Sequence, residues 1–147
     1  LNSEISYNAS SPDELALVNA SKNFGIEYLY SDVKKIYLKI MNENVIVEKI
    51  GILEYSSERK RMSILIKDEF GRYILYCKGS DDKLFSMSAE SISSDKIIEF
   101  KNSIKIFSNE GLRTLLIGFK ILSENELIEF MNDYKNANLD LDNKELL

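Results

Sequence analysis

The feature that most constrains the fold is a block of β-prone segments between residues 26 and 77, separated by short polar turns. The clearest pair flanks a polar turn at residues 68–71, whose composition and spacing predict a β-hairpin. Residues 42–44 predict another turn, and Gly51 a possible bulge within a strand. The expected strands lie at residues 26–30, 35–40, 45–55, 62–67 and 72–77.

The only proline of the chain, Pro12, marks the start of a helix. Ser11 can cap that helix and Pro12 takes its first position. Glu14 stands three residues after the cap, which completes the pattern of a capping box. Gly25 is expected to end the helix. The apolar residues expected to face the core are Leu17, Val18 and Phe24.

A helical period returns after Gly79. The further elements expected are helices at residues 81–87, 95–109 and from 123, and a strand at 113–121. Gly111 is expected to stop the second of these helices, and the Asn-, Asp- and Leu-rich residues 136–147 predict a linker. Together the segments predict an α+β fold, with an antiparallel β-sheet flanked by helices.

Composition narrows the possible functions. A chain of 147 residues with 44% hydrophobic residues fits one domain. Its net charge of −5 argues against nucleic acid or an anionic membrane as a partner. The absence of His excludes a His general base and His-ligated metals, and the single Cys77 excludes an internal disulfide and a multi-Cys zinc site.

Two further features bear on the context of the chain. No apolar run approaches the roughly 18 residues that a membrane span needs, and no signal-peptide pattern opens the sequence. The first residue is Leu rather than Met, which suggests a processed product or a piece excised from something longer.

The first two candidate binding residues are Glu14 and Tyr55. Glu14 could accept a hydrogen bond from a ligand amine, or it could only complete the capping box. Tyr55 offers a face on which a purine could stack, and Lys60 could then meet a phosphate. The alternative is a strand-end tyrosine followed by a solvated basic turn at residues 59–61. That run of three cations is also a weak basis for a nucleic-acid site in an acidic domain.

Two more cations stand at the ends of expected elements. Lys78 ends a strand and is followed by Gly79, which could bring an open backbone against a ligand. Arg113 follows the helix-stopping Gly111 and could fork onto phosphate oxygens. Each could equally be an ordinary surface residue, and the cations would matter only if they converged with Tyr55 and Glu14.

In order and spacing, four segments resemble the nucleotide-binding (N) domain of P-type ATPases, most closely the phospholipid-transporting flippase subfamily. Residues 7–18 (YNASSPDELALV) resemble its helix-start motif and residues 53–63 (LEYSSERKRMS) its aromatic-plus-basic motif. Residues 77–81 (CKGSD) resemble its Lys-Gly-Ala motif, and residues 110–115 (EGLRTL) its Gly-Leu-Arg-Thr motif.

The resemblance implies a role for each of five residues around one cleft. Glu14 would lie near the adenine amino group and Tyr55 would stack on the adenine. Lys60 would reach toward the phosphates, Lys78 would line the floor of the pocket, and Arg113 would contact the polyphosphate. Tyr55 stands where Phe is usual, and Ser80 where Ala is usual.

The resemblance also implies what the chain is part of. Residues 1–147 would form a single ATP-binding domain, excised from a larger membrane ATPase and located on its cytoplasmic side. The domain would present the γ-phosphate of ATP to the phosphorylation domain. The family's phosphorylated Asp-Lys-Thr-Gly-Thr string is absent. The fragment would therefore hold no catalytic residue and would not hydrolyse ATP by itself.

Further partners follow from the same resemblance. The parent would use Mg²⁺ that this domain does not hold, and its candidate partners are its own actuator domain and an accessory subunit. Phospholipid would be met only through absent membrane helices. The alternative is a non-catalytic interaction module that keeps the fold without nucleotide affinity.

Overall fold

A computed structural model of the chain describes residues 5–88 and 92–139. These residues form two compact units. The first contains residues 5–50 and 66–72, and the second contains residues 51–65, 73–88 and 92–139. Six strands form one sheet in the order β1-β2-β3-β4-β5-β6, which is also their order in the chain. The prediction of an antiparallel sheet flanked by helices is confirmed.

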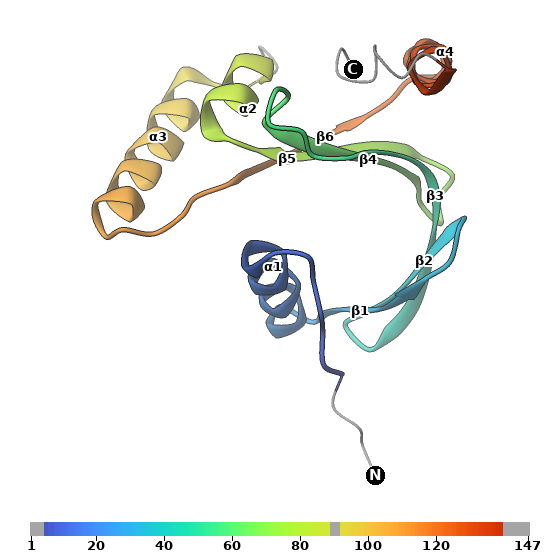
Figure 1. Cartoon of the computed structure of the whole chain (residues 1–147), viewed down its shortest axis with the longest axis horizontal. Helices are drawn as coiled ribbons and strands as arrows, with labels where there is room; N and C mark the ends of the chain where they lie inside the picture. Colours follow the sequence, from blue (N-terminus) through green and yellow to red (C-terminus); the bar gives the residue numbers. More distant parts are fainter. Residues whose placement is uncertain (1–4, 89–91, 140–147) are drawn as a thin grey trace. The chain divides into compact units, whose positions relative to one another are not determined.

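The first unit contains one helix beside the first strands, as Figure 1 shows for α1 and β1. Its elements are α1 (Pro12–Asn23), β1 (Ile26–Ser31), β2 (Lys35–Ile40) and the beginning of β3 (Glu43–Leu53). Ser11 is the N-cap of α1, and its Oγ accepts a hydrogen bond from the Glu14 backbone N–H at 3.2 Å. Gly25 follows the helix with a φ of +81°, the left-handed conformation that glycine adopts without strain. The predicted start and end of this helix are confirmed.

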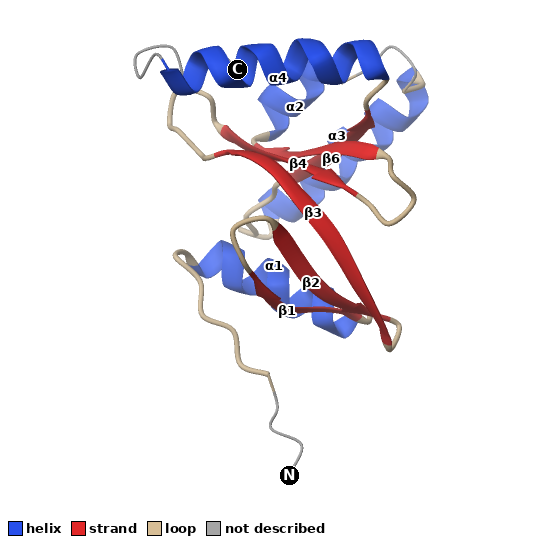
Figure 2. Ribbon diagram, turned by 90° about the vertical axis from the view of Figure 1, so that its right-hand side faces the viewer, coloured by secondary structure: helices blue, strands red, loops and turns tan. Residues whose placement is uncertain are grey.

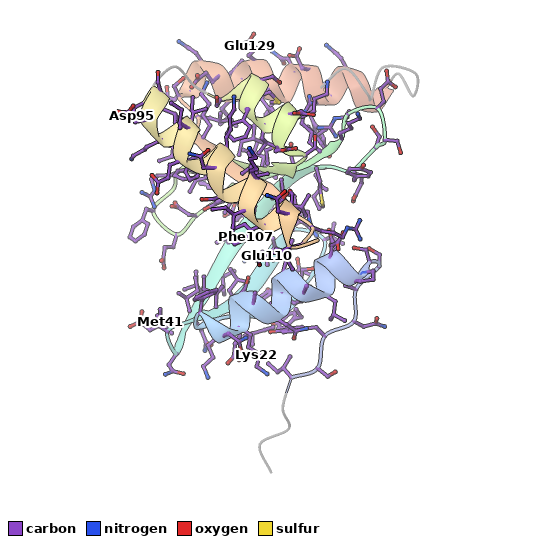
Figure 3. The ribbon with its side chains drawn as sticks, turned by 90° about the vertical axis from the view of Figure 1, so that its left-hand side faces the viewer. Lys22, Met41, Asp95, Phe107, Glu110 and Glu129 are labelled. Atoms are coloured by element: carbon purple, nitrogen blue, oxygen red, sulfur yellow. The ribbon has the colours of Figure 1, made fainter. Side chains whose placement is uncertain are left out.

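Two details of the first unit differ from the prediction. Phe24 does not face the core, because 75% of it is exposed beyond the last turn of α1. The turn between β2 and β3 is at Met41 and Asn42, which have φ values of 48° and 72°. Two consecutive left-handed residues make the tight turn that suits the twist of a hairpin. Met41 also contacts the end of α1, since its N–H donates to the Gly25 carbonyl at 2.8 Å; Figure 3 labels Met41 near this end of the helix.

The second unit contains three helices and the rest of the sheet, except for residues 66 and 67, which belong to the first unit. These elements are β4 (Arg61–Lys67), β5 (Tyr73–Gly79), α2 (Asp81–Met87), α3 (Ser94–Asn109), β6 (Leu116–Ile121) and α4 (Glu124–Leu139). The predicted hairpin is confirmed as β4 and β5, and α2 has the predicted bounds. Leu53, Leu65 and Ile74 are buried, and Leu65 is fully so.

Helices α2 and α4 lie on the same side of strands β4 to β6 (Figures 1 and 2). Gly118 of β6 lies under α2, because a Cβ at that position would be 3.8 Å from Leu84 Cδ2. Gly51 of β3 lies under α4 in the same way, with the ring of Tyr134 at 3.2 Å. The Tyr134 hydroxyl donates to the Ile52 carbonyl at 3.4 Å. The absence of a side chain at Gly51 therefore lets Tyr134 of α4 approach the sheet closely, whereas the contact at Gly118 would have room for a Cβ.

Other element bounds differ from the prediction. Strand β6 begins at Leu116 rather than 113, since residues 112–115 form an irregular connection. Helix α4 continues to Leu139, so the predicted linker at 136–147 begins too early, and residues 140–147 lie outside the described part. The possible bulge at Gly51 stays a prediction. The irregular register that the structure shows is in β1, between Tyr28 and Tyr30. Within residues 5–88 and 92–139, no helix combines the length and apolar character of a membrane span.

Candidate functional site

The loop at residues 54–60 joins β3 to β4 and carries two of the predicted site residues. The Arg59 N–H donates to Ser56 Oγ at 3.1 Å, and the Lys60 N–H donates to the Ser56 carbonyl at 2.8 Å. Lys60 has a φ of +52°, a left-handed conformation that turns the chain into β4. Tyr55 near the start of the loop is 62% exposed, so its ring is available for stacking.

Arg59 is buried, whereas the sequence alternative placed it in a solvated basic turn. Only 4% of Arg59 is exposed, and its Nη1 donates to the Glu54 carbonyl at 2.8 Å. Burial, and then the nearby positive charge of Arg61, lower the pKa of Arg59 from its usual range. Lys60, the next residue, is exposed. The basic run therefore contains one buried cation, Arg59, one that faces solvent, Lys60, and one that is half-buried, Arg61.

The end of β5 lies against this loop. A Cβ at Gly79 would lie 2.6 Å from the Lys60 carbonyl oxygen and 2.9 Å from Arg61 Cα. The Ser80 N–H donates to the same Lys60 carbonyl at 3.1 Å. The sequence predicted that Gly79 could bring an open backbone against a ligand. In the structure, protein backbone fills the space beside Gly79 instead. Lys78 is half-buried and directly precedes Gly79, the residue that lies against the Lys60 backbone.

Arg113 lies near the same end of the sheet because it is three residues from Leu116, which pairs with Gly79. Helix α3 ends before Gly111, which has a φ of +77°, and the Leu112 N–H donates to the Phe107 carbonyl at 3.0 Å. Figure 3 shows Phe107 and Glu110 at this end of α3, opposite Asp95. Arg113 is exposed, and three residues later Leu116 pairs with Gly79. Three residues span at most about 10 Å, so Arg113 is tethered near the β5 end.

Glu14 is the third residue of α1 and is half-buried. It belongs to the first unit, whereas the other four predicted residues belong to the second. The structure therefore brings Tyr55, Lys60, Lys78 and Arg113 to neighbouring segments. The approach of Glu14 to them stays a prediction.

The chemistry available at these segments is binding rather than bond making. Lys60, Lys78 and Arg113 can attract and hydrogen-bond anionic oxygens, and Tyr55 can stack on a planar ring. Among the residues that the structure describes, no three His, Cys, Asp or Glu side chains form a group that could hold a metal ion.

Sequence reasoning missed the roles of Arg59 and Gly79. Ser56, three residues before Arg59, is a signal for a tight turn, because a Ser hydroxyl often accepts from a nearby backbone N–H. In a run of three basic residues, however, nothing in the pattern indicates which one is buried. The predicted hairpin pairs the strands that carry residues 61 and 79, but its pattern does not show that the Lys60 carbonyl fills the space beside Gly79.

The fold is of the α+β class, with an antiparallel sheet flanked by helices. A family model described as "P-type ATPase, cytoplasmic domain N" matches residues 4–146. The chain therefore belongs to this family, the N domain of P-type ATPases.

Relatives in three kingdoms align with nearly the whole chain. Phospholipid-transporting ATPase IC of Xenopus tropicalis is 34% identical over 144 residues, which cover 97% of this chain and 11% of that protein. A phospholipid-transporting ATPase of Schizosaccharomyces pombe is 37% identical over 133 residues, covering 90% and 10%. Probable phospholipid-transporting ATPase 11 of Arabidopsis thaliana is 35% identical over 141 residues, covering 90% and 12%. The chain thus spans about a tenth of the length of these relatives.

Proposed function

We propose that residues 1–147 form a single ATP-binding domain of a phospholipid-transporting P-type ATPase, on the cytoplasmic side of its membrane. The observation that carries this proposal is the packing of Gly79, the neighbour of Lys78, against the Lys60 carbonyl, beside a loop with an exposed Tyr55. The family membership and the relatives' names support the parent activity.

Each side chain has a role in this proposal. Tyr55 stacks on adenine, which contributes about 1–3 kcal/mol. Lys60, Lys78 and Arg113 neutralise the phosphates, and Glu14 accepts a hydrogen bond from the adenine amino group. The domain holds ATP so that its γ-phosphate reaches an Asp of the phosphorylation domain. It acts by positioning and charge neutralisation rather than by bond chemistry.

The parent supplies what this chain does not. Its Mg²⁺ is held mainly outside this domain, and lipid is met by membrane helices elsewhere in the parent. The actuator domain and a possible accessory subunit are further partners. By itself the chain binds nucleotide and does not hydrolyse it.

Titration with ATP, followed by amide NMR shifts, tests the proposal. One aromatic stack and a few exposed cations give a binding free energy of roughly −4 to −6 kcal/mol, or a Kd between about 1 mM and tens of μM. Shifts are expected at Tyr55, Lys60, Lys78 and Arg113, and at Glu14 if it meets the base. Unmoved signals at millimolar ATP, with no thermal shift, would instead favour the interaction module.

A further inference from the structure

Arg59 is the one buried charged side chain among the residues that the structure describes. Burying a guanidinium is costly unless its hydrogen bonds are satisfied. Its Nη1 has a partner, but the buried Nε and Nη2 atoms have no hydrogen-bond partner within the described residues. Its burial therefore adds little to stability by itself and calls for another explanation.

The contacts of Arg59 join the two ends of the loop at residues 54–60. Its side chain binds the Glu54 carbonyl at the start, and its N–H binds Ser56 Oγ. At the other end, the Lys60 carbonyl is bound to Ser80 on the β5 side. Tyr55 lies directly after the residue that Arg59 holds. The loop is thus closed by its own backbone and one inward-facing arginine.

We propose that Arg59 is a positioning residue of the nucleotide site. Its buried guanidinium closes the loop at residues 54–60 and fixes Tyr55 in place before the base arrives. This inference rests on the proposed function. Arg59 does not touch the nucleotide; it acts through Tyr55. A loop that is already ordered loses less conformational freedom on binding, so the ligand binds more tightly.

The test compares Arg59→Met with the wild-type chain. Met keeps most of the side-chain volume and removes the donors together with the buried charge, so folding is expected to survive. Affinities for ATP and for adenosine are measured by NMR titration. Protection of the residue 59 and 60 amides is measured by hydrogen exchange. Arg72→Met is the matched control, because Arg72 is an exposed arginine paired with Asp68 on the β4–β5 turn.

Arg59→Met is expected to lower the affinities for ATP and for adenosine equally, by about tenfold. Hydrogen exchange at the amides of residues 59 and 60 is expected to become faster. The control leaves both affinities unchanged. A loss for ATP that spares adenosine would make Arg59 a phosphate ligand and overturn the inference. Unchanged affinity for both ligands would overturn it too.

A double-mutant cycle with Tyr55→Ala separates positioning from general damage. If Arg59 acts through Tyr55, Arg59→Met has almost no further effect on affinity once the ring is gone. If the two substitutions instead lower the affinity independently, so that their fold-changes multiply in the double mutant, the inference is contradicted.

Ser56→Ala replaces Arg59→Met if the latter does not fold. It removes the Oγ atom that accepts from the Arg59 N–H. Like Arg59→Met, it is expected to lower the affinities for ATP and adenosine equally. Equal affinity in this variant overturns the inference. A wild-type chain that binds neither ligand defeats the proposed function and the inference together, whereas a binding wild type with an unaffected Arg59→Met defeats the inference alone.

Discussion

The two connections that carry site residues in the second unit are built in opposite ways. The loop at residues 54–60 is closed by hydrogen bonds from Arg59 and Lys60 to Glu54 and Ser56. The connection at residues 112–115 follows Gly111, around which a Cβ would meet nothing within 4 Å, and it carries an exposed Arg113. The first connection therefore presents an exposed ring on a hydrogen-bonded loop, and the second presents an exposed cation after a glycine with open surroundings.

The largest effect is expected from adding a methyl group where the first connection is packed. Gly79→Ala places a Cβ 2.6 Å from the Lys60 carbonyl and should lower the free energy of unfolding by about 3 kcal/mol. Gly111→Ala meets open space and should cost only about 1 kcal/mol, through its left-handed backbone. Chemical denaturation measures both. Equal losses of unfolding free energy in Gly79→Ala and Gly111→Ala would show that the two connections do not differ in packing.

The second effect concerns the ring that the tighter connection holds. Tyr55→Ala should weaken ATP binding by about 2 kcal/mol, because the stacking surface is lost. Tyr55→Phe keeps the π face and should bind nearly as well as the wild type, while Tyr55→Leu should rescue little. Calorimetric or NMR titration measures the three affinities. If Tyr55→Phe lowers the ATP affinity as much as Tyr55→Ala does, the hydroxyl rather than the ring makes the interaction.

A smaller effect is expected at the looser connection. Arg113→Gln should weaken ATP binding by about 1 kcal/mol, because an exposed charge is screened by water and salt. Adenosine binding should not change, in contrast to the equal losses expected for Arg59→Met. Titrations of both ligands at two salt concentrations measure this. A loss for adenosine as well would mean that this connection also shapes the base site.

The smallest effect is expected at a third connection, between β6 and α4, which is closed by a titratable group. The Glu126 carboxylate accepts from Lys120 Nζ at 2.6 Å and from the N–H and Oγ of Ser123 at 2.8 and 2.7 Å. The hydrogen bond from Lys120, followed by those from Ser123, lowers the pKa of Glu126 from 4.5 to about 2.

Because this pKa is lower in the folded state, the stabilisation from Glu126 is complete above pH 4.5 and is lost as the pH falls toward about 2. Glu126→Gln should therefore lower Tm slightly at neutral pH and not at pH 2. Glu129→Gln is the matched control, an exposed carboxylate on the same helix (Figure 3). A Tm difference that persists at pH 2 would show that the carboxylate charge is not what closes this turn.

Local chemistry explains which parts of the fold could be predicted from the sequence. Ser11 and Pro12 determine the start of α1 through capping and a fixed φ, and Asp68 and Gly71 determine the β4–β5 turn. The exposure of Phe24 was not predictable in this way, because Phe24 is the C-cap of α1 and helical periodicity does not fix the direction of a cap side chain.

The site follows the same rule. Its residues could be proposed by resemblance, and their roles stay a prediction. The burial of Arg59 and the tight contact of Gly79 could not be predicted, although the β4–β5 hairpin that brings residues 61 and 79 to the same end was. A hydrophobic pattern indicates which strands pair, but not which cation of a polar loop turns inward.

The left-handed backbone of Lys60 has a consequence for engineering this chain. A non-glycine residue at a φ of +52° costs roughly 1 kcal/mol, which glycine at the same position would recover. Selection for heat resistance alone should therefore drift toward glycine at position 60 and discard a cation proposed to meet phosphate. A library screened for both properties should keep the lysine and accept a lower melting temperature.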